Sequence, residues 1–350
     1  MKIPIPEITK AGILLEKTTL DFENESVSNP GCYQDQALIH MFYRAVSKGN
    51  HSSIGYCALS DPLTVKERWR QPIYTGQHPS ESHGVEDPRI TKIEDTYYMT
   101  YTAYDGKNAL GALALSKDLQ NFTRAGIITP QVTRQRFKEL VRKNPRIPER
   151  YSNNESLYDE NRPGTALLLW DKDVMFFPRK IKGKLAFLHR VFPGIQVVYC
   201  DSIADLTEEY WEDYLGNLDK YMVLGSKYAF EHQYIGGGCV PVETPAGWLV
   251  VYHGVEQGQQ GKVYHAAAVL LDLDDPTVEI ARLPIPLFSP EKEWETSGYV
   301  NNVVFPTGTA RAGDRFYIYY GAGDSRIAVA SLSFDELMNA LLQQQLIYTS

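Results

Sequence analysis

The sequence feature that most constrains the fold is a pattern that occurs five times along the 350 residues. In each occurrence a proline follows a strand-like or turn residue, an alternating aromatic strand comes next, and a strand of small residues pairs with it. The prolines are Pro30, Pro88, Pro178, Pro241 and Pro306. The aromatic strands are expected at 38–44, 97–102, 185–190, 248–253 and 316–320. Repeats of this size and strand content are typical of propeller blades. The sequence therefore predicts an all-β, five-bladed β-propeller.

Two segments depart from the repeat. The interval between the second and third prolines is the longest and predicts an insertion at residues 131–165, which includes a short basic helix. The run 334–345 has apolar residues at helical spacing and predicts a C-terminal helix. We expect a single propeller domain over residues 1–350. A β-sandwich is the structural alternative, but it does not predict a recurring motif.

Composition excludes several classes of protein. The net charge of −8 and the lack of a basic patch argue against nucleic-acid binding. No apolar run approaches the roughly 20 residues of a membrane helix, and no secretion signal is visible, so a cytoplasmic location is expected. The cysteines lack C-x-x-C spacing, which predicts reduced thiols and no structural zinc. They are Cys32, Cys57, Cys200 and Cys239.

Differences among the repeats predict the functional site, because the first strand of each propeller blade lines the central channel. Asp87, within Gly-Val-Glu-Asp-Pro-Arg at 84–89, is the foremost candidate, with Arg89 expected beside it. Glu86 and Asp87 are adjacent, so only one of them can face the channel. The alternative is that Asp-Pro-Arg forms a turn with an ion pair.

Polar residues also stand at related places near the ends of the aromatic strands. We expect them to converge on one axis and form a polar pocket, although each could instead pair locally and shape a turn. They are Arg44, His189, Arg190, His253 and Asp324.

Other chemistries find no support in the sequence. G-x-S-x-G, H-E-x-x-H and P-loop motifs are absent. The glycines at 236–238 are not followed by a helix or by Lys-Ser/Thr, and the histidines are too scattered for a metal site. We therefore expect neither a metal nor another cofactor.

Taken together, these segments resemble glycoside hydrolase family 130, the β-mannoside phosphorylases and β-mannosidases. The matching segments appear in family order over about residues 29–331. They are 84–89, 177–184, 188–190, 247–255, 303–308 and 319–324. The resemblance implies a five-bladed propeller and inversion at the reacting carbon. It also implies that Asp87 is the proton donor, and that Arg44 and Asp324 hold the mannose before the cleaved bond.

The chain departs from the phosphorylase pattern at two places. Lys172-Asp173 stands where many phosphorylases carry Arg-Asn, and Glu243 stands where many carry Lys. A glutamate in a phosphate site repels the anion, by about 1–4 kcal/mol at ~4 Å. The same glutamate is a candidate general base, as are Glu293 and Glu295. Candidate phosphate ligands remain: Arg179, Lys180, Arg190 and His253.

The leading hypothesis is therefore an inverting β-mannosidase, β-1,2-specific. In it Asp87 is the general acid, and Glu243, or one of Glu293 and Glu295, is the base that activates water. The second is a β-mannoside phosphorylase that uses inorganic phosphate and releases mannose 1-phosphate. The third is a non-catalytic carbohydrate-binding propeller. The expected partners are an oligosaccharide substrate, phosphate in the second case, and a further copy of the chain if the 131–165 insertion forms a subunit contact.

Overall fold

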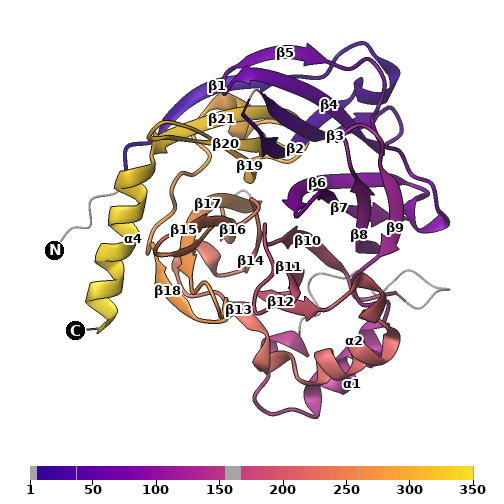
Figure 1. The fold of residues 1–350 in the computed structure, drawn as a ribbon, viewed down its shortest axis with the longest axis vertical. Coiled ribbons are helices and arrows are strands. Elements are labelled where there is room, and N and C mark those ends of the chain that lie inside the picture. The colour runs from indigo at the N-terminus through magenta and orange to yellow at the C-terminus, as the bar shows by residue number, and fades with distance from the viewer. Residues whose placement is uncertain (1–5, 37, 154–166, 260, 350) are drawn as a thin grey trace.

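The computed structural model describes residues 6–36, 38–153, 167–259 and 261–349, and it is mostly β-sheet with few helices (Figure 1). Antiparallel pairing groups the strands into five units that follow one another around a centre, and single parallel bridges from β4 to β6 and from β8 to β10 link the first three units into one sheet. Unit 1 comprises β2 (Ser26–Gln34), β3 (Ile39–Ser47), β4 (His51–Asp61) and β5 (Thr64–Arg68). Unit 2 comprises β6 (Gly84–Ile93), β7 (Thr96–Tyr104), β8 (Ala109–Ser116) and β9 (Thr123–Ile127). Unit 3 comprises β10 (Asp171–Phe176), β11 (Leu185–Val191), β12 (Ile195–Cys200) and β13 (Met222–Leu224).

The last two units are built slightly differently. In unit 4 the inner strand is split, because β14 and β15 both pair with β16. Unit 4 comprises β14 (Tyr234–Gly237), β15 (Val242–Thr244), β16 (Gly247–Gly258), β17 (Gly261–Leu271) and β18 (Glu279–Arg282). Unit 5 comprises β19 (Val304–Ala312), β20 (Arg315–Ala322), β21 (Arg326–Ser333) and β1 (Thr9–Leu15). Unit 5 therefore joins the N-terminal strand to the C-terminal strands.

Apolar side chains pack each unit against the next. Separate buried clusters lie between units 1 and 2, 2 and 3, 3 and 4, and 4 and 5, and one more lies between units 5 and 1. The cluster between units 5 and 1 includes Tyr319 and Val329 on one side and Met41 and Leu59 on the other. Because unit 5 packs on unit 1, the arrangement is circular and leaves the inner strands around a common axis.

Helices lie outside the units. They are α1 (Arg134–Arg142), α2 (Glu208–Gly216), α3 (Glu293–Thr296) and α4 (Phe334–Thr349). The predicted C-terminal helix is confirmed by α4, and the predicted basic helix corresponds to α1, which packs with α2 beside unit 3. The end of the predicted 131–165 insertion lies outside the described residues. Within the described part of the chain, no helix combines the length and the apolar character needed to cross a membrane.

A buried network of the same composition occurs in four of the five units. A glutamate in the helical turn before the unit's first strand accepts hydrogen bonds from a tyrosine of the second strand and a cation of the outermost strand. The glutamates are Glu23, Glu81, Glu231 and Glu295. Their partners are Tyr43 and Arg68, Tyr101 and Arg124, Tyr252 and Arg282, and Tyr320 and Lys10, in that order. We call each network an anchor.

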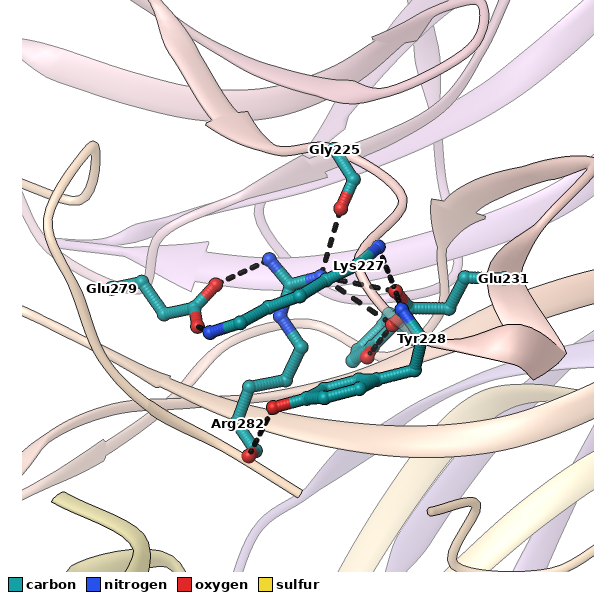
Figure 2. A network of polar contacts seen from close by, with 7 residues as sticks. Gly225, Lys227, Tyr228, Glu231, Glu279 and Arg282 are labelled. Atoms are coloured by element: carbon teal, nitrogen blue, oxygen red, sulfur yellow. Dashed lines mark hydrogen bonds and ion pairs between the residues drawn. The ribbon is translucent and has the colours of Figure 1, made fainter. Parts of the chain in front are cut away.

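The anchor of unit 4 is the most extensive (Figure 2). The Glu231 carboxylate accepts backbone N–H bonds from Lys227 and Tyr228, at 2.6 and 3.0 Å, as well as bonds from Tyr252 and Arg282. Arg282 also donates to the Gly225 carbonyl at 2.8 Å. Burying a carboxylate costs several kcal/mol unless it is paired and fully hydrogen-bonded. The Glu231 carboxylate meets that condition, because it accepts bonds from two backbone N–H groups, from Tyr252 and from Arg282.

Unit 3 replaces the anchor tyrosine with a histidine. His189 of β11 is fully buried, with Nδ1 2.6 Å from Oδ2 of Asp171 and Nε2 2.8 Å from the hydroxyl of Tyr214 on α2. The network therefore ties α2 to this unit. Burial raises the pKa of Tyr214 well above its ordinary value, so its hydroxyl keeps its proton.

Glu295 and Glu243 were both candidates for the general base, but only Glu295 belongs to an anchor. Replacing each should therefore have a different effect on the free energy of unfolding. In Glu295→Gln, the Lys10 ammonium loses its buried partner at 2.7 Å, and we expect a loss of about 3–5 kcal/mol in the free energy of unfolding. In Glu243→Gln, only an exposed pair with Arg179 is lost, and we expect a change below about 1 kcal/mol. Chemical denaturation followed by circular dichroism measures both. Equal stabilities of the two variants would contradict the anchor assignment.

Candidate active site

The first strands of units 1, 2 and 3 carry the same backbone irregularity. In each, the pairing register with the second strand skips two residues, and the first skipped residue adopts a left-handed backbone conformation. These residues are Asn29, Asp87 and Asp173, with φ of 51°, 52° and 59°. Asn and Asp tolerate this conformation better than other non-glycine residues. All three face the central pocket.

This register corrects one element of the predicted repeat. Pro30 and Pro88 follow Asn29 and Asp87, as expected, but the equivalent position in unit 3 is Val174, after Asp173. Pro178 lies beyond the end of β10, in the turn that leads to β11. The proline pattern therefore identified the unit but not the residue that faces the axis.

Strand alternation decides which residue of each second strand faces the pocket. In β3, β11 and β16 the anchor residue points away from the axis, and the residue after it points toward the axis. Tyr43, His189 and Tyr252 belong to the anchors, whereas Arg44, Arg190 and His253 line the pocket.

The pocket on the axis has a volume of about 390 Å³ and takes residues from all five units. Its polar and charged lining residues are Asn29, Arg44, Asp87, Lys172, Asp173, Arg190, His253, Lys262 and Asp324. Its aromatic lining residues are Trp170, Phe192, Tyr234, Tyr264 and Phe305. A concave site with polar groups that converge between aromatic rings suits a sugar, which has both hydroxyl groups and apolar faces.

Asp87 lies among donors and cations. Nδ2 of Asn29 donates to Oδ1 of Asp87 at 2.8 Å, and Nη1 of Arg44 lies 3.9 Å from the same oxygen. Burial opposes ionisation of this carboxyl, but Arg44, Lys172 and the Asn29 hydrogen bond outweigh it and hold the pKa of Asp87 below its ordinary value. Asp87 is therefore ionised near neutral pH.

The pKa of Asp324 is shifted in the opposite direction to that of Asp87. Burial raises its pKa above the ordinary value, and the neighbouring carboxylates of Asp87 and Glu86 add to this rise, although Arg44 opposes it. Arg44 thus interacts electrostatically with three carboxylates, those of Glu86, Asp87 and Asp324. Its Nη2 donates to Oε1 of Glu86 at 2.8 Å. Environments that separate the pKa values of neighbouring acids are typical of catalytic sites.

Cations gather on the side of the pocket formed by units 3 and 4. The Arg190 guanidinium lies 5.5 Å from the centre of the Tyr234 ring, and the Lys262 ammonium lies 5.2 Å from it. Nε of Arg190 is 3.1 Å from Oδ2 of Asp173, and the hydroxyls of Tyr234 and Tyr264 are 2.6 Å apart. Two cations and two hydroxyl groups beside a single carboxylate form a surface suited to an anion.

His253 lies next to this surface in neutral form. Burial lowers its pKa to about 4, and its Nδ1–H donates to the Gly237 carbonyl at 3.0 Å. A Cβ atom at Gly236 would come within 2.3 Å of the His253 ring, so only glycine fits there. The glycine run at 236–238 therefore allows the backbone of unit 4 to approach the pocket residues closely.

The structure brings together five of the twelve candidate residues proposed from the sequence. Arg44, Asp87, Arg190, His253 and Asp324 line the pocket. Arg89 lies buried close to it, where Nε donates to the Gly238 carbonyl and Nη1 donates to the Asp87 carbonyl at 3.0 Å. Arg89 therefore joins units 2 and 4 and does not line the pocket.

The remaining residues lie elsewhere, which corrects the expectation that they face the pocket. Glu243 pairs with Arg179 at 2.9 Å and Lys180 pairs with Glu94 at 3.0 Å, all on the protein surface. Glu295 and His189 belong to the buried networks of units 5 and 3. Glu293 lies on α3 beside Glu295 and is not among the pocket residues. None of these glutamates is positioned to activate water in this pocket.

Several pocket residues were not proposed as site residues from the sequence. They are Asn29, Trp170, Lys172, Asp173, Tyr234, Lys262 and Tyr264. Asn29 and Asp173 can be found by aligning the units. Each directly follows the residue that pairs with Arg44 or Arg190, and each then takes the place that Asp87 has in unit 2. Lys262 and Tyr264 lie in a part of β17 whose sequence carries no motif. Among the described residues, no group of three or more His, Cys, Asp or Glu is arranged to hold a metal ion.

Comparisons with known proteins identify the family of the chain. The model of glycoside hydrolase family 130, described as beta-1,4-mannooligosaccharide phosphorylase, matches residues 15–343. A 1,2-beta-oligomannan phosphorylase of Thermoanaerobacter sp. (strain X514) is 30% identical over 345 residues, which cover 96% of this chain and 99% of the relative. A beta-1,2-mannobiose phosphorylase of the same organism is 32% identical over 333 residues, which cover 91% and 93%. The chain is therefore an enzyme of the glycoside hydrolase or phosphorylase class. The chain belongs to glycoside hydrolase family 130.

Solved structures share the fold. The beta-1,2-mannobiose phosphorylase of Listeria innocua, in complex with beta-1,2-mannobiose, superposes with a TM-score of 0.69 at 21% identity, covering 96% of this chain and 99% of the other. A structure from work on family 130 hydrolases that target beta-1,2 mannosidic linkages in Candida mannan gives 0.71 at 21% identity, covering 94% of each chain.

The contact between Asn29 and Asp87 leads to a test by pH dependence. An N–H donor favours the ionised carboxylate, so its removal raises the pKa of Asp87. Asn29→Gly removes the donor without strain at φ 51°. If Asp87 is a general acid, activity falls as pH rises through its pKa, so with saturating phosphate the alkaline limb of kcat should move upward by about one pH unit. A limb that stays in place or moves downward would contradict this arrangement.

Proposed function

We propose that this enzyme is a β-mannoside phosphorylase that cleaves β-1,2-linked mannosides with inversion. The observation that carries the proposal is the cation surface of Arg190 and Lys262, which lies across the pocket from Arg44 and Asp324 and next to Tyr264. A phosphorolytic enzyme needs such a surface to bind inorganic phosphate. The two relatives described above are named as phosphorylases of β-1,2-mannosides and match nearly their whole length.

The roles of the pocket residues follow from their charges. Arg44 and Asp324 would hold the mannosyl unit whose bond is cleaved, while Arg190 and Lys262 would hold phosphate beneath its reacting carbon. Asp87 would give its proton to the glycosidic oxygen as the bond to that oxygen breaks and a phosphate oxygen bonds to the carbon. The products are mannose 1-phosphate and the shortened sugar, and Asp87 recovers a proton from solvent.

Phosphate binding would also prepare Asp87 for this role. Arg44 and Lys172 keep the pKa of Asp87 below its ordinary value. A phosphate dianion bound in the same pocket, on Arg190 and Lys262, offsets part of the effect of Arg44 and Lys172, so the pKa of Asp87 rises when phosphate is bound. The acid is thereby protonated more readily in the complex that reacts.

One observation favours an inverting β-mannosidase as the second candidate. Asp173 stands beside Arg190 on the side of the pocket where the nucleophile must arrive, and Oδ2 of Asp173 is buried. A carboxylate at that place repels phosphate and is suited to activate water. Inverting hydrolysis needs two carboxyl groups about 6.5–9.5 Å apart, with the water between them. Asp87 and Asp173 would form that pair.

We also propose that the five units are the blades of a single five-bladed β-propeller domain. The circular packing of the units supports this description, as does the pairing of β1 with β21, which joins both ends of the chain in one blade. A closed arrangement of this kind holds the inner strands of all blades around one pocket.

The two functions differ in their dependence on phosphate. A phosphorylase degrades β-1,2-mannobiose only with inorganic phosphate and forms mannose 1-phosphate, whereas a mannosidase forms mannose in either case. Arg190→Met should raise the KM for phosphate by at least tenfold, because a desolvated charge–charge contact is lost. Arg179→Met is the matched control, since Arg179 lies outside the pocket. Turnover without phosphate, unaffected by either change, would favour the mannosidase.

Asp87→Asn tests the general acid in both candidates. Asparagine tolerates φ 52° and keeps the shape of the side chain, so the fold should be retained. The loss of a proton donor should reduce kcat by about 10²–10⁴-fold. Circular dichroism checks the fold, and turnover of β-1,2-mannobiose gives the rate. Near-normal turnover by a folded Asp87→Asn enzyme would exclude Asp87 as the acid.

A further inference from the structure

Glu86, the residue before Asp87 on β6, is a buried carboxylate with no part in the proton transfer or phosphate binding proposed above. It is not among the residues that line the pocket. Strand alternation alone would point it away from the side of Asp87. The left-handed conformation of Asp87 interrupts the alternation, and both carboxylates reach the same guanidinium. Arg44 lies 2.8 Å from Oε1 of Glu86 and 3.9 Å from Oδ1 of Asp87.

Glu86 joins cations from two other units. Nη2 of Arg44, in unit 1, donates to Oε1 of Glu86, and Oε2 lies 4.0 Å from the Lys172 ammonium of unit 3. Ser52 contacts both members of the first pair. Nε of Arg44 donates to the Ser52 hydroxyl at 3.0 Å, and that hydroxyl donates to Oε1 of Glu86 at 3.4 Å. One oxygen of the carboxylate therefore fixes the direction of Arg44, and the other holds Lys172.

The pairing register explains why an acid and a cation meet at this place. Ser28, Glu86 and Lys172 directly precede the left-handed residues of units 1, 2 and 3, so they occupy equivalent positions. Glu86 is the acid among these three and Lys172 is the cation. The two side chains come within ion-pair distance of each other. The repeated strand geometry thus places the acid of unit 2 and the cation of unit 3 together beside Asp87.

The charged and polar groups around Asp87 come from four units. Those that favour its ionised form are Arg44 of β3, Lys172 of β10, Arg89 of β6 and Asn29 of β2. Asp324, in the turn between β20 and β21, is a like charge when it is ionised. A general acid must carry a proton before the bond breaks, so cations that stabilise its carboxylate oppose its role. A second carboxylate that pairs with two of these cations offsets part of their effect.

We propose that Glu86 is a positioning residue that holds Arg44 and Lys172 at the distances from Asp87 at which Asp87 can carry and release a proton. The inference rests on the proposed function for the role of Asp87 as general acid, and it applies whether phosphate or water is the nucleophile. Glu86 acts through the two cations and is not itself a proton donor. Arg44 lies closer to Glu86 than to Asp87, which is the arrangement that this role requires.

Glu86→Gln keeps the size of the side chain and removes its charge. Arg44 and Lys172 then act more strongly on Asp87, so the pKa of Asp87 should fall. Because a general acid loses activity as pH rises through its pKa, the alkaline limb of kcat for β-1,2-mannobiose, with saturating phosphate, should move downward by about one pH unit. This direction is opposite to the one expected for Asn29→Gly. A structural role alone would lower stability or kcat without moving the limb, so a limb that stays in place or moves upward in folded Glu86→Gln would overturn the inference.

A second pair of variants tests the inference even if Glu86→Gln alone does not fold. Lys172→Met removes one of the two cations and should move the limb upward. The double variant Glu86→Gln/Lys172→Met loses the acid together with its partner, and its limb should lie below that of Lys172→Met and return toward the position in the unaltered enzyme. Coincident limbs in Lys172→Met and the double variant would overturn the inference. Circular dichroism checks the fold of each variant.

The same measurements separate this inference from the proposed function. Near-normal turnover by Asp87→Asn would contradict the general acid and overturn the inference with it. Turnover without phosphate would contradict the phosphorylase function alone, because the shifts expected for Glu86→Gln and Lys172→Met do not depend on the nucleophile. An inactive Asp87→Asn enzyme combined with an unmoved limb in Glu86→Gln would contradict the inference alone.

Discussion

The buried pairing of a glutamate with a tyrosine and a cation is the interaction on which the rest of this structure depends. It occurs in units 1, 2, 4 and 5, and each time it joins the turn before the unit, the second strand and the outermost strand. Burial raises the pKa of each of these tyrosines, so each hydroxyl remains a donor. A buried carboxylate that lost one partner would be costly, so the anchors allow little variation in how the strands are placed.

The anchors also determine what faces the axis. Because neighbouring residues of a strand point to opposite faces, fixing Tyr43 and Tyr252 outward fixes Arg44 and His253 inward. The left-handed residues of the first strands complete the pocket from the other side, where Asn29 contacts Asp87 directly. The residues that line the pocket therefore differ in type from unit to unit. The anchor residues next to them are nearly the same in each unit and fix their direction.

Much of this was predictable from the sequence, and the failures have physical causes. The repeat predicted the β-sheet units, and apolar spacing predicted the C-terminal helix. Five of the twelve candidate site residues line the pocket. The prediction that Glu295 and His189 face the pocket was wrong, because sequence periodicity does not show which face of a strand or turn contacts a tyrosine hydroxyl. Glu243 was misplaced because β15 continues beyond the split in the inner strand of unit 4, outside the pocket. Lys262 and Tyr264 could be identified only from the structure, because no sequence pattern shows that this end of β17 lines the pocket.

The central claim is that phosphate attacks from the side of Arg190 and Lys262, while Asp87 protonates the leaving oxygen on the opposite face. Its most direct test is the configuration of the first product formed from β-1,2-mannobiose and phosphate, followed by proton and phosphorus NMR during turnover. The account predicts α-mannose 1-phosphate. Formation of β-mannose 1-phosphate, or of free mannose without an equal amount of mannose 1-phosphate, would contradict it.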